Sequence, residues 1–309
     1  MNIDPSKQTK LYGHEDHINS LLKLYKKDYL PNKILFSGEK GVGKSTLAYH
    51  LINLILSNDE VGVYDLKNFQ INSENKSFRL IQNKSNPNFI LVDVNQEKKN
   101  IDIGQIRNLI LTLNKSSFNT KPRFVLIDNI ELLNTNSINA LLKILEEPND
   151  NINFILINNN KKILPTLKSR CLNFKISLTF EQSISITNKL LNENLNNFLN
   201  KEFITYYSTP GQLLNIINFA NINNIDLKNL NLKDLISKII LDRKYKKDLS
   251  IKYLIYLLIE LYFRNNISIK NIDLINMYNY FLKKINTTKI FNLDEEALFM
   301  EFEDKIFNE

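Results

Sequence analysis

The chain is poor in the residue types that build disulfide-linked and metal-bound scaffolds. Its 309 residues include one cysteine, Cys171, and three histidines, His14, His17 and His50. A lone cysteine excludes an internal disulfide, a four-cysteine zinc site and a cysteine-ligated iron–sulfur cluster. No third ligand accompanies His14 and His17, so we expect no zinc and place the histidines at the surface. We expect Cys171 to behave as a small buried hydrophobe.

Long apolar stretches are also missing. The first ten residues are polar and contain no apolar segment of a secretory signal. The most apolar run begins at Ile251, but it contains Lys252 and Glu260 and is shorter than a bilayer span. We therefore expect a soluble cytoplasmic protein with no membrane contact.

The positive charge is confined to one part of the chain. Residues 1–175 hold 24 Lys and Arg against 17 Asp and Glu, whereas residues 176–309 hold 16 of each. The whole net charge of +7 therefore lies in the first part. Such a charge permits a nucleic-acid partner without requiring one.

Short apolar runs alternate with helical stretches in the first half of the chain. Most of these runs lack a period of two, which is typical of parallel strands buried on both faces. The predicted strands are Lys33–Ser37, Phe89–Asp93, Arg123–Ile127, Asn153–Ile157 and Leu172–Ile176. A helix over Ser137–Glu147, ended by Pro148, carries apolar residues on one face. The pattern predicts an α/β domain in which helices cover both faces of a parallel sheet.

The strand signals stop near residue 177, and the remainder has helical patterns separated by short Asn-rich breaks. We place domain boundaries near residues 177 and 228. The predicted domains are an α/β domain over 1–177, a small helical domain over 178–228 and a second helical domain over 229–309.

One segment matches the phosphate-binding pattern G-x-x-x-x-G-K-S/T in full, between a predicted strand and a predicted helix. Glycines let backbone N–H groups curl around an anion, and a helix N-terminus adds its dipole. Lys44 can reach the β and γ phosphates of ATP, and the Ser45 hydroxyl can bind Mg²⁺. The predicted nucleotide site comprises Gly38, Glu39, Lys40, Gly41, Val42, Gly43, Lys44, Ser45 and Thr46.

A P-loop enzyme also needs an acidic residue at the end of a neighbouring strand to hold the Mg²⁺ shell. Asp128 follows the strand Arg123–Ile127 and meets this need. The next residue is Asn129, and a carboxamide cannot accept the proton of an attacking water. Glu131 lies two residues further on, and nothing in the sequence places it at the water. We predict ATP binding with weak or absent hydrolysis; the open alternative is a slow ATPase in which Asn129 orients the water.

Four segments together resemble the AAA+ clamp-loader ATPases of bacterial DNA polymerase III: Leu11–Leu22, the P-loop, Asn136–Pro148 and Leu164–Cys171. The resemblance covers residues 11–176. It implies an AAA+ P-loop domain over 1–177, a helical lid over 178–228 and a helical collar over 229–309 that joins other subunits. It also implies a hetero-pentamer with gamma/tau and delta subunits, which uses ATP to open a sliding clamp and close it on primed DNA.

Three departures from the motor subunits of this family favour the delta-prime type. The segment Asn58–Asn88 lacks the four-cysteine zinc module of the motors, Asn129 stands where they have Glu, and Gln212 stands where they have Arg. The alternative within the family is an active gamma/tau motor. Outside it, the alternatives are a helicase loader, a Holliday-junction motor or a free-standing nucleotide-binding protein.

The resemblance assigns roles to residues outside the P-loop. Arg170, in Ser-Arg-Cys, would act in trans as an arginine finger on a neighbour's γ-phosphate. Asn158 and Asn159 stand where the family has a polar phosphate sensor, and the alternation of strand residues leaves open which one faces the nucleotide.

A helix beginning near Asp102 lies where the family contacts DNA. Gln105 and Arg107 are therefore candidates for phosphate contacts without base specificity. Asp102 fits equally well as a plain helix N-cap.

Overall fold

We describe the protein from a computed structural model. The structure describes residues 4–94, 98, 100–115, 119–146, 151–246, 248–267, 272–291 and 293–307. Glu147 and Pro148, at the predicted end of one helix, lie outside these residues. The chain divides into two compact units, Met1–Thr179 and Phe180–Glu309, which we treat separately.

The first unit is built around a five-stranded parallel sheet in the order β2-β3-β4-β1-β5. Its strands are β1 (Lys33–Ser37), β2 (Phe89–Val92), β3 (Arg123–Ile127), β4 (Ile152–Asn158) and β5 (Leu172–Lys175). Its helices are η1 (Pro5–Lys7), α1 (Glu15–Lys26), α2 (Lys44–Leu56), α3 (Lys76–Gln82), α4 (Ile103–Leu113), η2 (Ile130–Leu132), α5 (Thr135–Glu146) and α6 (Pro165–Lys168). All five predicted strands are confirmed, each within one residue at either end.

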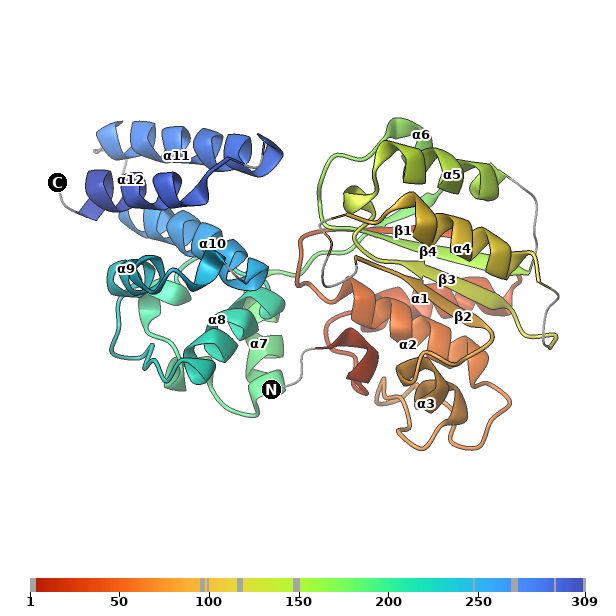
Figure 1. Cartoon of the computed structure of the whole chain (residues 1–309). Coiled ribbons are helices and arrows are strands. Elements are labelled where there is room, and N and C mark those ends of the chain that lie inside the picture. Colours follow the sequence, from red (N-terminus) through yellow and green to blue (C-terminus); the bar gives the residue numbers. More distant parts are fainter. Residues whose placement is uncertain are drawn as a thin grey trace. The chain divides into compact units, whose positions relative to one another are not determined.

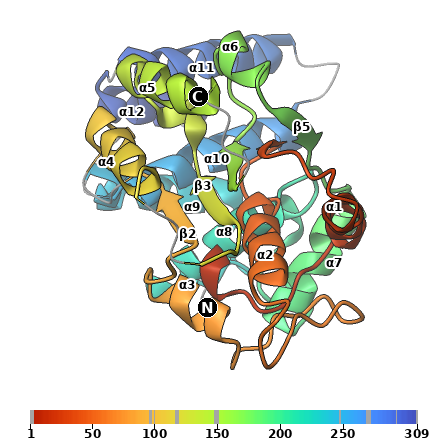
Figure 2. The same ribbon diagram turned by 90° about the vertical axis from the view of Figure 1, so that its right-hand side faces the viewer.

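Helices cover both faces of the sheet, as predicted. Figures 1 and 2 show α4 and α5 on one face and α1 and α2 on the other. On the first face, Leu35 of β1 and Val125 of β3 belong to one buried cluster with Leu109 of α4 and Leu141 of α5. Every residue of β3 is buried, which explains why this strand shows no apolar–polar alternation in the sequence.

A buried arginine caps the C-terminal end of helix α4. Arg123 is 7% exposed, and its guanidinium donates to the carbonyls of Thr112 at 2.7 Å and of Leu113 and Lys115 at 3.0 Å. The last carbonyls of a helix have no partner within the helix, and a cation there is favoured by the helix dipole. Arg123 therefore fixes α4 against the amino end of β3.

The parallel strands end at a common edge, where the loops after β1, β3 and β4 begin. Ser37 of β1 pairs with Asn158 of β4, and Ile127 of β3 pairs with Leu156 of β4. The residues after Ser37, Ile127 and Asn158 therefore emerge side by side. Ligand sites in open parallel sheets lie at this carboxyl edge.

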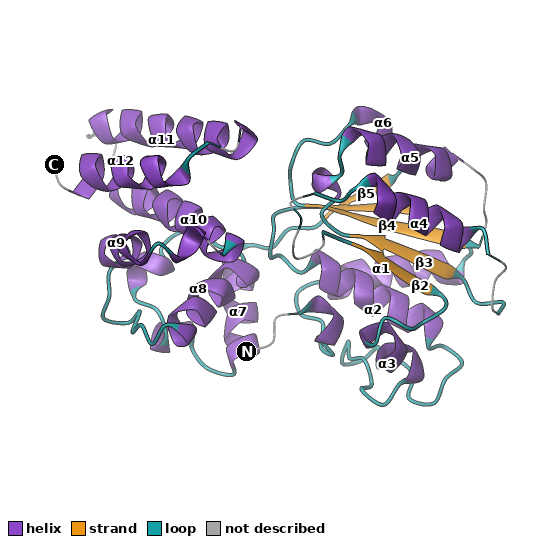
Figure 3. Ribbon diagram, in the orientation of Figure 1, coloured by secondary structure: helices purple, strands orange, loops and turns teal. Residues whose placement is uncertain are grey.

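The second unit contains only helices among its described residues (Figure 3). They are α7 (Phe180–Leu191), η3 (Leu195–Asn197), η4 (Lys201–Phe203), α8 (Pro210–Ile222), α9 (Leu232–Asp242), η5 (Lys244–Lys246), α10 (Leu249–Asn266), α11 (Ile272–Phe291) and α12 (Glu295–Phe307). One buried cluster contains residues from Leu195 to Phe307, on both sides of residue 228. The division of this unit at residue 228 remains a prediction.

The apolar run that begins at Ile251 lies in α10, whose Phe263 packs against Phe281 and Phe302 with ring centroids 6.0 and 5.7 Å away. Within the described part of the chain, no helix combines the length and the apolar character needed to cross a bilayer.

Candidate nucleotide site

The loop between β1 and α2 has the shape of an anion cradle. Gly41 and Gly43 have φ angles of 90° and 95°, and Gly43 is the N-cap of α2. A Cβ at Gly38 would lie 2.0 Å from the carbonyl oxygen of Ile176, so only glycine fits where the loop leaves β1. The Gly38 N–H donates to the Asn158 carbonyl at 3.2 Å. A backbone of this shape at a helix N-terminus favours a bound phosphate.

The Lys44 side chain is 3% exposed and folds back over this loop. Its Nζ donates to the carbonyls of Gly38 at 3.0 Å and Glu39 at 2.6 Å. Burial lowers the pKa of Lys44 to about 8, while the charges of Asp128 and Glu131 oppose this shift. Because a nearby anion favours the ammonium form, a nucleotide phosphate would be a stronger partner than the two carbonyls.

The two residues predicted to share a Mg²⁺ ion lie in contact. Ser45 Oγ donates to Asp128 Oδ2 at 2.6 Å. Burial raises the pKa of Asp128, and the hydrogen bond from Ser45 acts in the opposite direction. A hydroxyl and a carboxylate are the hard oxygen ligands that Mg²⁺ prefers, so the donor set fits the predicted ion.

The remaining predicted P-loop residues differ in exposure. Glu39 and Lys40 are exposed, Thr46 is half-buried, and Val42 is buried. The exposed pair leaves the outer side of the loop in contact with solvent.

Asn129 is the centre of a hydrogen-bonded network rather than a free side chain. It has a φ of 55°. Its Nδ2 donates to Asp93 Oδ1 at 2.8 Å, and its Oδ1 accepts from Asn159 Nδ2 at 2.8 Å. Asn159 also donates to Glu131, through Nδ2 to Oε1 at 2.9 Å and through its backbone N–H to Oε2 at 3.2 Å. Both polar atoms of the Asn129 amide are therefore engaged.

Two members of this network were missed by sequence reasoning. Glu131 lies beyond the strand end, but the 3₁₀ helix η2 turns it back to Asn159. Asp93 follows β2 directly. The available signal was its place at the carboxyl end of a predicted strand, the same edge at which Asp128 lies.

The structure separates the two adjacent asparagines after β4. The Asn158 side chain closes a local turn, since its Nδ2 donates to the Lys161 carbonyl at 2.9 Å and its Oδ1 accepts from the Lys161 N–H at 3.3 Å. Asn159 instead faces Asn129. Of the two sensor candidates, Asn159 is the one directed toward the residues after β3.

The expected surface position is wrong for two of the three histidines. His14 is 1% and His50 is 0% exposed. His14 Nε2 lies 2.6 Å from the carbonyl of Val42, and His50 bonds Gln8 and Tyr64. Burial lowers the pKa of both, to about 4 for His50. Neutral imidazoles with carbonyl partners tolerate burial, and His14 thereby supports the P-loop.

Arg170 lies just after α6 and is partly exposed. Its Nη1 donates to the Thr166 carbonyl at 2.7 Å, and its Nη2 forms an ion pair with Glu146 at the end of α5. Cys171, the next residue, is half-buried, and burial raises its pKa to about 11. Cys171 packs at the margin of the α4–α5 cluster, which gives it the character of a small hydrophobe.

The candidate DNA-contacting residues differ in their surroundings. Asp102 and Gln105 form a reciprocal capping box at the start of α4, and Gln105 Nε2 also donates to the Asp93 carbonyl at 2.7 Å. Arg107 is exposed on α4. The capping role of Asp102 is thus realised, while DNA contact by Gln105 and Arg107 remains a prediction.

Gln212 likewise serves as a helix cap. Its Oε1 accepts from the Thr209 N–H at 2.8 Å, and its N–H donates to Thr209 Oγ1 at 3.3 Å, at the start of α8. The side chain at this position is therefore fixed by its own helix end.

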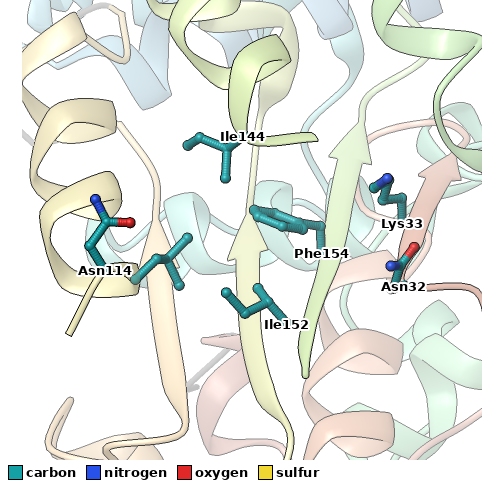
Figure 4. A pocket seen from close by; sticks show the side chains of 7 residues that line it. Asn32, Lys33, Asn114, Ile144, Ile152 and Phe154 are labelled. Carbon is teal, nitrogen blue, oxygen red and sulfur yellow. The ribbon is translucent and has the colours of Figure 1, made fainter. Parts of the chain in front are cut away.

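A separate pocket lies at the opposite edge of the sheet, where β1 and β4 begin. It is lined by Asn32, Lys33, Leu113, Asn114, Ile144, Ile152 and Phe154 (Figure 4). It contains none of the predicted site residues and has no glycine-rich loop. The P-loop edge therefore remains the candidate site.

Comparison with known proteins gives a consistent set of relatives. The model of the family described as "DNA polymerase III, delta subunit" matches residues 13–179. The DNA polymerase III subunit gamma of Buchnera aphidicola subsp. Schizaphis graminum is 31% identical over 73% of this chain and 62% of its own length. The DNA polymerase III subunit delta′ of Buchnera aphidicola subsp. Baizongia pistaciae is 31% identical over 46% of this chain and 42% of its own length.

Similar solved structures include a DNA polymerase III gamma subunit-related protein from Thermotoga maritima. It has a TM-score of 0.49 at 17% identity and covers 92% of this chain and 96% of its own. The chain spans less than two thirds of the length of the gamma and delta′ relatives that it matches.

Proposed function

The chain belongs to the AAA+ family of bacterial DNA polymerase III clamp-loader subunits, and we propose that it serves as the delta-prime subunit. In this role it joins gamma/tau and delta subunits and helps the complex to load the sliding clamp onto primed DNA at the expense of ATP. It contributes an arginine to a neighbouring ATP site and rigid contacts to the other subunits, and it hydrolyses little or no ATP itself.

The observation that carries this proposal is the arrangement of Asn129. A hydrolytic site needs a group that accepts a proton from the attacking water. The carboxamide of Asn129 has no such capacity, and both its polar atoms are engaged by Asp93 and Asn159. The chain therefore retains the means to hold a nucleotide while its hydrolysis is weak or absent.

ATP and Mg²⁺ are the ligands proposed for the P-loop edge. The loop amides and Lys44 would hold the β and γ phosphates, and Ser45 and Asp128 would hold the ion or its water shell. The bound ion would neutralise phosphate charge. To donate to a phosphate oxygen, Asn159 Nδ2 would have to release one of its present acceptors, Asn129 Oδ1 or Glu131 Oε1.

Arg170 is the residue through which this subunit would act on a neighbour. A guanidinium stays charged and matches two phosphate oxygens at once. Arg170 is partly exposed and lies just after the short helix α6, so a neighbouring subunit can reach it. We propose that it stabilises the charge that develops on a neighbour's γ-phosphate.

An active gamma/tau-type motor is the alternative function, and two observations favour it. The match to a gamma subunit covers 73% of this chain, against 46% for a delta′ subunit. The Glu131 carboxylate also lies within the Asn129 network. Steady-state ATP hydrolysis by the purified chain, abolished by Lys44→Ala, would replace the delta-prime proposal with this one.

The decisive experiment reconstitutes the complex. The chain is co-purified with gamma/tau and delta subunits of the same organism, and clamp loading onto primed DNA is measured with and without it. We expect assembly and loading only when the chain is present. A chain that stays monomeric and leaves loading unchanged would overturn the proposal.

The arginine role is tested in the same complex. Arg170→Ala should assemble normally and reduce hydrolysis at the site it faces by about a thousandfold or more. Arg79→Ala is the matched control, because Arg79 is an exposed arginine of the same unit in an ion pair with Glu74. The control should leave DNA-stimulated hydrolysis unchanged.

A further inference from the structure

The guanidinium of Arg170 is held by two acceptors from different elements. Nη1 donates to the carbonyl of Thr166 in α6, and Nη2 pairs with the carboxylate of Glu146, the last residue of α5. A guanidinium has five N–H groups in one plane, and these contacts use two of them. The pair lies 24 residues apart in sequence, so it connects two helix ends that the chain does not join directly.

This ion pair contributes little to the stability of the fold. The Arg170 and Glu146 side chains are 33% and 54% exposed, and exposed pairs contribute little to stability. Fixing a long arginine side chain also costs conformational entropy. The pair therefore adds little to the stability of the fold, and its main effect is on where the guanidinium lies.

We propose that Glu146 is a positioning residue for Arg170. Together with the Thr166 carbonyl it orients the guanidinium plane before a neighbour arrives, so that the remaining N–H groups meet a phosphate without a further search through rotamers. This inference rests on the proposed role of Arg170 as a finger in trans. It adds that the end of α5 determines how well the finger works.

The charge of Glu146 has a second possible effect, which makes the inference testable. A carboxylate beside Arg170 also competes with phosphate for the same cation. If competition dominated, Glu146 would act as a latch and its removal would raise hydrolysis. If positioning dominates, as we propose, its removal lowers hydrolysis.

The test uses the assembled complex with saturating clamp and primed DNA. Glu146→Ala should lower kcat of DNA-stimulated hydrolysis at the ATP site that Arg170 faces by about tenfold to a hundredfold, the range expected from misplacing a catalytic group. KM for ATP should change little, because the finger acts in the transition state. Glu146→Gln keeps an acceptor oxygen for Nη2 and should restore most of the activity.

Glu74→Ala is the matched control, since it breaks another exposed Arg–Glu pair of the same unit. It should leave kcat unchanged. The variant Arg170→Ala/Glu146→Ala should be no slower than Arg170→Ala alone, because Glu146 acts only through Arg170.

The outcomes separate this inference from the proposed function. Unchanged hydrolysis in Arg170→Ala would overturn the finger and the positioning role together. A large loss in Arg170→Ala with no loss in Glu146→Ala would overturn only the positioning role. A gain in Glu146→Ala, or an additive loss in the double variant, would also overturn it.

Discussion

Asn129→Asp is the sharpest test of the network at the carboxyl edge of the sheet. The substitution preserves shape but replaces the amide group that donates to Asp93 Oδ1 at 2.8 Å with a second carboxylate. A charge-assisted hydrogen bond, worth roughly 1.5–3 kcal/mol, is lost. Two like charges about 4 Å apart add about 4 kcal/mol of repulsion at an effective dielectric of about 20.

Both side chains are half-buried, so solvent and small movements reduce this sum. We expect Asn129→Asp to lower the free energy of unfolding by about 3 kcal/mol at pH 7.5. The deficit should shrink as the pH falls toward 5, because a proton taken up by the carboxylate pair removes the repulsion. The exchange variant Asp93→Asn/Asn129→Asp restores one donor opposite one acceptor and should recover most of the loss.

Urea unfolding of the full chain, followed by circular dichroism because the sequence has no tryptophan, measures these differences. Asn129→Ala serves as a reference that removes the hydrogen bond without adding charge. The reasoning fails if Asn129→Asp is as stable as the parent chain, or if the exchange variant is no better than Asn129→Asp alone.

Three further predictions follow from buried cations and imidazoles. Burial lowers the pKa of His50 to about 4, against an ordinary 6.5. Between pH 7 and 5 only the unfolded chain therefore takes up this proton, and the free energy of unfolding falls by about 2 kcal/mol. Thermal unfolding of His50→Gln should lack this part of the pH dependence. Lys44→Ala should weaken ATP binding about a hundredfold, and equal affinity of the two chains for a fluorescent ATP analogue would refute the site. Arg123→Met removes the guanidinium donor from the carbonyls of Thr112, Leu113 and Lys115 and should cost about 2–4 kcal/mol in urea unfolding. Arg79→Met should stay within about 0.5 kcal/mol.

The strands were predictable because each is a short apolar run buried on both faces, a pattern that β3 shows over its whole length. The shape of the loop between β1 and α2 was predictable because its glycines stand at a fixed spacing before a predicted helix. Both patterns lie within short stretches of sequence, so they can be recognised without knowledge of tertiary contacts.

The other contacts at the site depend on neighbours that are distant in sequence. Asp93 and Asn159 reach Asn129 across 36 and 30 residues, and Glu131 returns to the site through a single turn of 3₁₀ helix. The burial of His50 likewise depends on Gln8, 42 residues away. Sequence periodicity carries no information about such pairings. The choice between Asn158 and Asn159 depended on one fact, namely which of the two side chains at the end of β4 faces Asn129.

The strand order has a consequence for how the protein is made. Ile34 of β1 pairs with Ile155 of β4 and with Leu172 of β5. Strand β1 therefore cannot pair with either neighbour until more than a hundred further residues have been synthesised. At about 5–20 residues per second that interval is on the order of ten seconds. During it, the apolar run of β1 has neither of its neighbours and is exposed to chaperones or to other nascent chains. The P-loop is equally late, because Gly38 takes its place only against Asn158 and Ile176. We therefore expect the proposed nucleotide to bind the nascent chain only after β5 has left the ribosome, so that it would be a ligand of the finished domain and not an aid to its early folding.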